Sequence, residues 1–273
     1  MLASAIAPEV ESVKTRLKNI WMVGDHDRFS RYMEHSAREF YERLLVVPGY
    51  RLLGVGCGSG QLALMAAKDG LAVTGVDIAS NRVERAKARA QAEGLRARFE
   101  EAAAEALPFE DGSFDVVASR IAAMFAPRQD LVAKELLRVC KPGGTIAMAN
   151  WTPQGFVGQM FKTVSTFIAP SGMPSPVLWG DEATVRERLS KGLSELNLVR
   201  RHYTFSYPFS PSEVVEFFRL YYGPTNQAFA SLDADGRERL SRELEGLWSA
   251  HNRAGNDCTT VFAEYLEVIG IRA

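Results

Sequence analysis

The chain has 273 residues, of which 47% are hydrophobic and 24% charged, and its formal net charge is -1. This composition supplies enough apolar side chains for a sizeable core and disfavours disorder. The near-neutral charge disfavours a nucleic acid partner, because phosphate backbones select clearly basic surfaces.

The N-terminal part of the chain favours helices. Apolar residues recur at helical spacing, which predicts an amphipathic helix over 9–21 and a second helix over 29–45. Glu9 and Glu11 interrupt the first stretch, so it is not typical of a signal peptide. No apolar run approaches the roughly 18 residues that cross a membrane. We therefore expect a cytoplasmic protein without a membrane partner.

The middle of the chain alternates between short apolar strands and helices. The predicted strands are 50–56, 72–78, 96–102, 114–120 and 145–151, and the predicted helices are 62–68, 81–93 and 130–139. The segment "KPGG", 141–144, is predicted to be a turn. This alternation indicates right-handed βαβ units and a parallel sheet with helices on both faces.

The last third is less regular. We predict helices over 156–168, 181–192, 212–222 and 233–251, and strands over 198–209 and 259–271. Two further strands favour continuation of the same sheet past Trp151. The expected fold is therefore an α/β, doubly wound, mostly parallel seven-stranded sheet with N-terminal helices and helical insertions near the C-terminus. We treat 1–273 as one domain: N-terminal helices over 1–48, a core over 49–151, and the rest of the sheet with its insertions over 152–273.

Four glycines mark the turn from the first strand into the first helix of the core, Gly54, Gly56, Gly58 and Gly60. Glycine permits positive φ and lets a ligand lie against bare backbone, and this turn is where doubly wound folds bind adenosine cofactors. Asp77 ends the next strand, where its carboxylate can accept hydrogen bonds from both hydroxyls of a ribose.

The glycine spacing distinguishes between cofactors. A dinucleotide site requires G-x-G-x-x-G. Counting from Gly54 puts Ser59 at the third position, and counting from Gly56 puts Gln61 there. The alternating G-x-G-x-G pattern therefore disfavours a nucleotide-dependent oxidoreductase. A tight turn without any ligand is the alternative reading of this stretch alone.

Four ordered motifs carry a resemblance to a known family: "LLGVGCGSGQLAL", "VTGVDIA", "AEALPFEDGSFDVVASR" and "ELLRVCKPGGTIAMANW". Their order and spacing resemble class I S-adenosylmethionine-dependent methyltransferases. They look most like the small-molecule branch that resembles ubiquinone and menaquinone biosynthesis enzymes, the type 11 domain. The resemblance spans roughly 50–151. It implies S-adenosyl-L-methionine as cofactor and methyl transfer to a small molecule. We expect no metal site.

The resemblance also implies residue roles. Gly56, Cys57 and Gly58 would line the methionine and the ribose. Asp77 would bind the ribose diol. The other expected cofactor-binding residues are Gly54, Gly60 and Gln61 in the loop; Ile78, Ala104 and Glu105 around adenine; Arg120 and Ile121 beneath the methionine; and Arg82, whose alternative reading is a solvated helix face.

The chain departs from the family at two positions. An acid is usual where this chain has Gly54, and an aspartate near the adenine amine is frequent where it has Ala103. Each loss removes about 1 kcal/mol of hydrogen bonding. A protein that binds the cofactor without transferring a methyl group is therefore an alternative reading.

No catalytic residue is assigned from the sequence. Methyl transfer from a sulfonium depends mainly on positioning, and a base is required only for a nucleophile that keeps its proton. The candidate bases are His26, His35, His202, His251, Tyr221 and Tyr222. For all of these except His35, a purely structural position in the core or at the surface is the alternative. Cys57 lacks an evident partner base, so we do not assign it as a nucleophile.

Aromatic residues gather in the last part of the chain, where 17 of the 27 lie from Trp151 onward. Most are expected to be core, among them Phe218, Tyr222 and Trp248. A surplus on helices around the mouth of the sheet nevertheless favours an apolar or aromatic acceptor. This expectation requires those helices to lie over the carboxyl edge of the sheet.

The three cysteines, Cys57, Cys140 and Cys258, are far apart and form no C-x-x-C pair. This pattern argues against a zinc site or a disulfide framework and is typical of a reducing compartment. Exposed strand edges or the helical insertions would allow a homodimer.

Overall fold

The computed structural model describes residues 3–169, 172–255 and 257–273, and for residues 3–11, 26, 27, 33 and 34 it describes the backbone only. The strands are β1 Arg51–Val55, β2 Ala72–Asp77, β3 Ala97–Glu101, β4 Phe114–Arg120, β5 Cys140–Trp151, β6 Leu193–Tyr207 and β7 Thr259–Arg272. The α-helices are α1 Ala3–Met22, α2 His26–Ser30, α3 Glu34–Glu42, α4 Gln61–Lys68, α5 Ser80–Ala92, α6 Gln129–Val139, α7 Phe156–Ser165, α8 Glu182–Leu189, α9 Pro211–Tyr221, α10 Gly223–Ala230 and α11 Ala234–His251. Short 3-10 turns are η1 Arg31–Met33, η2 Ala123–Phe125, η3 Pro176–Gly180 and η4 Ser190–Gly192.

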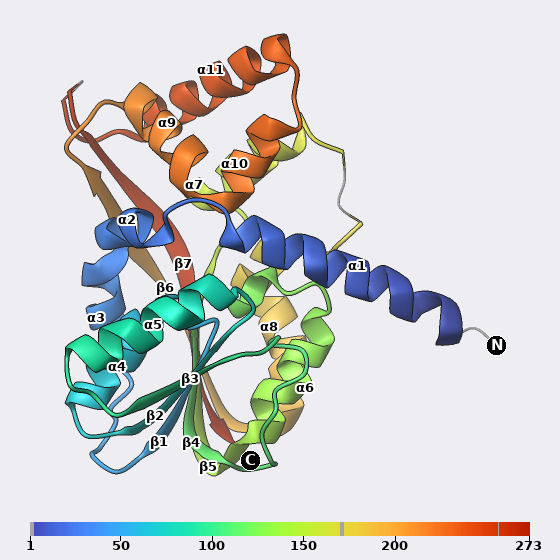
Figure 1. Cartoon of the computed structure of the whole chain (residues 1–273), viewed down its shortest axis with the longest axis vertical. Helices are drawn as coiled ribbons and strands as arrows, with labels where there is room; N and C mark the ends of the chain where they lie inside the picture. Colours follow the sequence, from blue (N-terminus) through green and yellow to red (C-terminus); the bar gives the residue numbers. More distant parts are fainter. Residues whose placement is uncertain (1–2, 170–171, 256) are drawn as a thin grey trace.

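The described strands form one seven-stranded sheet in the order β3-β2-β1-β4-β5-β7-β6. Strands β1 to β5 are parallel, and β7 runs antiparallel to both β5 and β6. Helices α3, α4 and α5 lie on one side of the sheet, and α6 and α8 lie on the other (Figure 1). The predicted doubly wound α/β fold is therefore confirmed, with a mixed sheet rather than a wholly parallel one.

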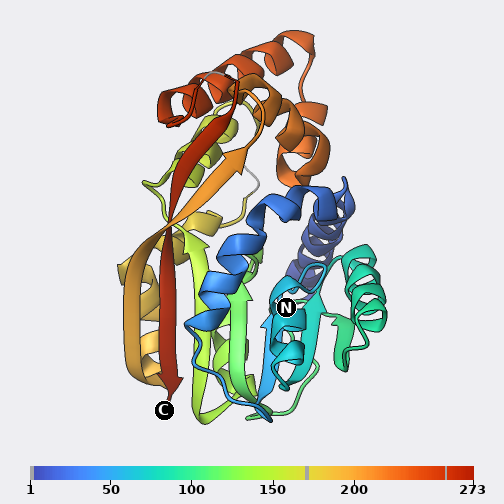
Figure 2. The ribbon, with the colours of Figure 1, turned by 90° about the vertical axis from the view of Figure 1, so that its left-hand side faces the viewer.

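Strands β6 and β7 continue beyond the end of β5. The last pair of β5 and β7 is Trp151 with Tyr265, whereas β7 stays paired with β6 as far as Thr259, opposite Tyr207. This two-stranded ribbon rises above the sheet and carries α7, α9, α10 and α11 at the carboxyl end of the parallel strands (Figure 2). We call these four helices the cap.

Local sequence explains where the cap helices begin. Ser210 Oγ accepts a hydrogen bond from the backbone amide of Glu213, and the carboxylate of Glu213 accepts one from the backbone amide of Ser210. Pro211 occupies the first turn of α9. This reciprocal capping box satisfies two backbone amides that a helix end leaves unpaired. Asp233 caps α11 by accepting from the amide of Gly236.

An aromatic cluster joins the cap to the sheet. The ring of Trp248 on α11 lies 4.5 Å from that of Phe156 on α7 and 5.7 Å from that of Phe205 on β6. Trp248 is only 1% exposed. Because these rings belong to both layers, the cap and the ribbon share one core with the sheet.

Several sequence-based assignments were wrong in detail. The strand predicted over 198–209 is β6 Leu193–Tyr207, and the first helix begins before residue 9. The predicted helix over 29–45 is broken into α2, η1 and α3 and ends at Glu42. The predicted turn "KPGG" lies within the bounds of β5, as an outward loop between the pairs Phe114–Cys140 and Val116–Thr145, with Gly143 at φ 74°. Helix α10 was not predicted, because its sequence "GPTNQAFA" contains Gly and Pro and has no apolar face of helical period.

None of the described helices has both the length and the apolarity needed to span a membrane.

Candidate functional site

A cavity opens at the carboxyl end of β1, β2 and β4, where the strand order reverses. The glycine loop after β1 forms its floor. Gly56 has φ 68°, and a Cβ built on it would lie 2.3 Å from the Cβ of Ala122 after β4. Only glycine permits both this backbone angle and this approach. The loop therefore packs directly against the segment that follows β4 and leaves its backbone facing the cavity.

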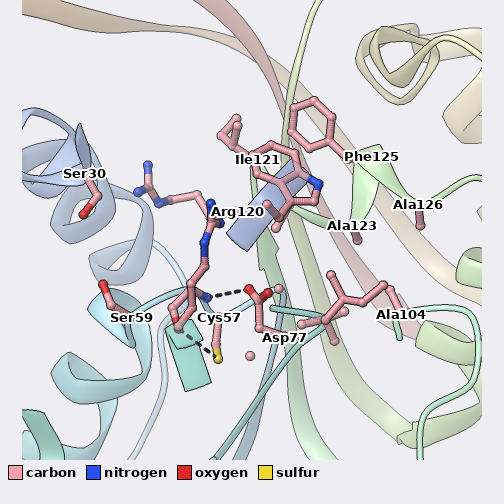
Figure 3. Close-up of a pocket in the computed structure, with 18 of the residues that line it drawn as sticks. Ser30, Cys57, Ser59, Asp77, Ala104, Arg120, Ile121, Ala123, Phe125 and Ala126 are labelled. Carbon is pink, nitrogen blue, oxygen red and sulfur yellow. Dashed lines mark hydrogen bonds between the residues drawn. The ribbon is translucent and has the colours of Figure 1, made fainter. Parts of the chain in front are cut away.

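Asp77 at the end of β2 is held by the backbone around it. Its Oδ2 accepts from the amide of Gly58 at 2.9 Å, and its Oδ1 accepts from the amide of Ala79 at 2.9 Å. The side chain is 6% exposed and lines the cavity beside Cys57 (Figure 3). Each carboxylate oxygen retains a lone pair, so Asp77 can accept two further hydrogen bonds from a ligand.

Glu105, which follows β3, is a buried acid with its partners in place. It accepts from the backbone amide of Arg128 at 2.6 Å and from that side chain at 2.9 Å, and Lys14 of α1 lies 3.8 Å away. These cations neutralise the carboxylate inside the cavity wall. Glu105 therefore shapes this end of the cavity together with Ala104, and Arg128 and Lys14 already balance its charge.

Arg120 at the end of β4 has neutral partners. Its guanidinium donates to Ser36 Oγ at 3.0 Å and to Gln61 Oε1 at 3.2 Å, and Gln61 in turn donates to the carbonyl of Ser30. Burial lowers the pKa of Arg120. Arg120 lies between Ser30 and Ile121 in the close-up (Figure 3). This network ties the N-terminal helices to the first residue of α4.

Ile121 stands at a bend in the chain. Its φ is 51°, a left-handed angle that is strained for a β-branched residue and costs on the order of 1–3 kcal/mol. Its amide donates to the carbonyl of Ala149 at 2.8 Å. The bend directs Ala122 towards Gly56 and brings the backbone of η2 to the cavity wall.

The N-terminal helix α1 closes one side. Trp21 packs against Phe125 at 4.8 Å and Tyr222 at 5.8 Å between ring centroids, and the guanidinium of Arg82 lies 5.1 Å from the Trp21 ring centroid. Arg82 is 9% exposed and lines the cavity, so the solvated reading is wrong for this residue. Its neighbour Arg85 on the same helix is exposed, as expected.

The upper wall is apolar and comes from the cap, the ribbon and the last residue of β5. Its residues are Trp151, Val157, Met160, Phe205, Phe218 and Tyr222. The cap helices therefore lie over the carboxyl edge of the sheet. The expectation of an apolar or aromatic acceptor depended on this placement. Trp248 and Trp179 are instead fully buried core residues.

The structure brings nearly all of the expected cofactor-binding residues to this cavity. Those that line it are Gly54, Gly56, Cys57, Gly58, Gln61, Asp77, Ile78, Arg82, Ala104, Glu105, Arg120 and Ile121. Gly60 lies outside the lining: a Cβ there would face Ala86 and Phe99, so it serves the packing of α4. Sequence reasoning missed Leu17, Trp21 and Phe29, because their apolar spacing is the same as that of ordinary core residues.

None of the histidines with a described side chain lines the cavity. His35 is exposed and lies 3.3 Å from Glu39, His202 is exposed on β6, and His251 ends α11 with its ring centroid 5.3 Å from that of Phe156. The side chain of His26 lies outside the described residues.

Cys57 lines the cavity, yet its surroundings disfavour reactivity. Burial and the nearby Asp77 carboxylate raise the pKa of its thiol well above the ordinary value. Burial also raises the pKa of Cys140 to about 12. Since the thiolate is the reactive form, neither thiol is activated at neutral pH.

We expect an aromatic disulfide reagent at pH 8 to modify Cys258 rapidly and to leave Cys57 and Cys140 unmodified for at least tenfold longer. Cys258 is exposed, whereas the other two stay protonated. The measurement is the number of thiols released per chain against time, with urea-denatured protein giving all three. The Cys258→Ser variant is the control, and a fast-reacting thiol in that variant would contradict the prediction.

Comparison with known proteins agrees with this geometry. A family model described as a methyltransferase domain matches residues 53–148. An uncharacterised protein of Mycobacterium tuberculosis (strain ATCC 25618 / H37Rv) is 40% identical over 246 residues, which are 88% of this chain and 90% of that protein. A 2-methyl-6-phytyl-1,4-hydroquinone methyltransferase of Synechocystis sp. is 46% identical over 105 residues, which are 38% of this chain and 33% of that enzyme.

A solved structure shares the fold. Phosphoethanolamine N-methyltransferase 2 of Haemonchus contortus, in complex with phosphomonomethylethanolamine and S-adenosylhomocysteine, aligns with a TM-score of 0.57 at 20% identity over 87% of this chain and 52% of that chain. Identity at this level shows the fold alone. The sheet order and the glycine loop define a Rossmann-like methyltransferase scaffold. The chain belongs to the class I S-adenosylmethionine-dependent methyltransferase family.

Proposed function

We propose that this protein transfers a methyl group from S-adenosylmethionine to a small apolar or aromatic acceptor. The observation that carries the proposal is that one cavity joins two unlike halves. One half is the glycine loop with Asp77, and the other is the apolar wall of the cap, including Phe205 and Phe218. A donor and an acceptor bound in these halves would face one another.

The first half fits the cofactor. The bare backbone at Gly56 and Gly58 leaves room for a nucleoside to lie close, and the carboxylate of Asp77 is fixed by two backbone amides. Because the Asp77 carboxylate is already fixed in place, it can accept hydrogen bonds from a ribose diol without a further loss of side-chain entropy. Ile78 and Ala104 supply the apolar surface beside it for an adenine ring.

The second half fits an apolar acceptor. Its aromatic and aliphatic side chains are fixed in the shared core, so they form a ready-made surface. The polar groups available to orient the acceptor at this wall include the hydroxyl of Tyr222, whose pKa burial raises. Tyr222 therefore stays protonated and can donate or accept a hydrogen bond at neutral pH.

The protein's chemical contribution is positioning and exclusion of water. When bound, S-adenosylmethionine supplies a methyl group already activated by its sulfonium. Because the pKa values of Cys57 and Tyr222 are raised, both side chains stay protonated at neutral pH and neither serves as a general base. Orientation alone is worth several kcal/mol, up to roughly 7–11 in the best cases. The cap and α1 supply it by enclosing the cavity.

A second candidate function is binding without methyl transfer. Gly54 and Ala103, where family members carry acids, both line the cavity, so the side chains lost there would have faced a ligand. Such losses weaken binding by about one to two powers of ten. This reading retains Asp77 and the glycine loop.

Calorimetry and a turnover screen test the proposal together. We expect binding of S-adenosylmethionine and S-adenosylhomocysteine but not of NAD, and release of S-adenosylhomocysteine when quinols, phenols or amines with apolar bodies are supplied. Binding of NAD with no binding of the sulfonium would overturn the proposal. Sulfonium binding without turnover across a broad screen would favour the binding-only function.

A further inference from the structure

Arg82 is a buried cation that lies between the cofactor half of the cavity and the aromatic rings that enclose the acceptor half. It belongs to the first turn of α5, which follows the strand that ends at Asp77, and it lines the cavity. Its guanidinium carbon lies 5.1 Å from the centroid of the Trp21 ring, and that ring lies 5.8 Å from the ring of Tyr222. Arg82 therefore brings a positive charge to the aromatic side of the cavity.

The charge of Arg82 acts on groups of both halves. Burial raises the pKa of Tyr222 in the apolar wall, and the positive charge of Arg82 opposes that rise. Burial and the Asp77 carboxylate raise the pKa of the Cys57 thiol in the glycine loop, and Arg82 again acts in the opposite direction. A hydroxyl group of an acceptor bound beside Tyr222 would experience the same attraction towards its ionised form.

The other charged residues of the described cavity lining lie at other places. Arg120 ends β4 and donates to side chains of the N-terminal helix α3 and of α4. Lys14 lies 3.8 Å from the carboxylate of Glu105, which follows β3. Asp77 ends β2, where its carboxylate accepts two backbone amides. Arg82 instead packs on a ring of the helix that closes the cavity towards the cap.

We propose that Arg82 stabilises the acceptor as an oxyanion, so that the acceptor is a phenol or an enol that binds in its ionised form. A cation within about 4–6 Å of an acidic group lowers its pKa by about 1–3 units. A guanidinium keeps its charge at any physiological pH and hydrogen-bonds oxygen anions in its plane. This inference rests on the proposed function for the methyl donor.

The ionised acceptor balances the charges of the reaction. The hydroxyl proton of the acceptor leaves to water, so this step requires no protein base. The oxyanion then forms the bond to the methyl carbon, the carbon–sulfur bond breaks, and its electron pair stays on sulfur. An anion and a sulfonium thereby become a neutral ether and the neutral thioether S-adenosylhomocysteine. Because the product no longer carries the negative charge, it loses the attraction of Arg82, and this favours its release.

The test measures the pKa of a phenol bound in the cavity. The probe is para-nitrophenol, because its anion is yellow and its acid form is colourless. The protein is saturated with S-adenosylhomocysteine, whose neutral sulfur keeps the charge of the sulfonium out of the measurement, and the absorbance of the bound phenol is recorded against pH. The proteins compared are the unmutated chain, Arg82→Met, Arg82→Lys and Arg120→Met.

We expect Arg82→Met to raise the pKa of the bound phenol by about one unit or more, which is a tenfold or greater change in its ionisation constant. Methionine keeps an apolar stem against Trp21 but removes the charge. Arg82→Lys keeps the charge and should recover most of the shift. The matched control is Arg85→Met, which removes an exposed arginine from the same helix and should leave the pKa of the bound phenol unchanged.

An equal pKa of the bound phenol in the unmutated and Arg82→Met proteins would overturn the role of Arg82. The same conclusion would follow if Arg120→Met raised this pKa and Arg82→Met did not. If Arg82→Met no longer bound the phenol, binding with the lowered pKa by Arg82→Lys would support the role, and its absence there would overturn it. Failure of the unmutated protein to bind S-adenosylhomocysteine or the phenol would instead overturn the proposed function.

Discussion

Asp77→Ala is expected to weaken binding of S-adenosylmethionine at least tenfold while the protein remains folded. Hydrogen bonds to a charged acceptor contribute about 1.5–3 kcal/mol each, and the substitution removes the acceptor for a ribose diol. It also leaves the amides of Gly58 and Ala79 without their partner, which loosens the loop that faces the nucleoside. The measurement is calorimetric affinity, with circular dichroism as the check on folding.

Asp115→Ala is the matched control for this substitution. Asp115 also accepts a backbone amide, that of Arg51 at 2.8 Å, and it pairs with Lys141, but it lies at the opposite end of β4. It should cost similar stability and leave cofactor affinity unchanged. If Asp77→Ala bound the cofactor as tightly as the unmutated protein, the ribose would have to be held elsewhere.

Trp248→Ala is expected to lower the free energy of unfolding by about 3–5 kcal/mol, the usual cost of emptying a large buried aromatic site. The indole contacts rings from α7, the ribbon and α9, at 4.5 Å from Phe156 and 5.3 Å from Phe218. Because Phe218 also lines the cavity, we expect the acceptor wall to loosen with it. Urea unfolding followed by circular dichroism gives the energy.

Glu245→Ala on the same helix is the control, since Glu245 is exposed and should change stability by no more than about 0.5 kcal/mol. Trp248→Phe should recover part of the loss. A cost below about 1 kcal/mol for Trp248→Ala would contradict a core shared between the cap and the sheet, and would indicate that the cap packs independently.

Local patterns predicted the strand ends and the glycine loop that line one half of the cavity. The strand 114–120 was located at its observed bounds, and the end of β2 was placed within one residue of Asp77. These elements are short and strongly patterned, and glycine is required where φ is positive, as at Gly56. Their positions at adjacent strand ends follow from the parallel topology alone.

The packing of helices against one another decided which side chains line the cavity, and the sequence patterns did not predict this. The sequence of α5 does not distinguish Arg82 from Arg85, yet one lines the cavity against Trp21 and the other is exposed. The difference depends on where α1 crosses α5, and no local sequence pattern predicts that contact. The apolar spacing of Trp21 and Phe29 likewise predicts burial, but not that the surface they cover belongs to a cavity.

The amino-acid sequence by itself determined the family, the doubly wound sheet, the glycine loop and the acid beyond it, because each depends on motifs and periodicity within successive strand–turn–helix units. Only the tertiary structure decided that the cap and α1 close over the same strand ends and that Arg120 faces the cavity with neutral partners. These features depend on contacts between segments more than 50 residues apart, such as Ser36 with Arg120. Such contacts arise from the packing of whole elements, which periodicity along the chain does not encode.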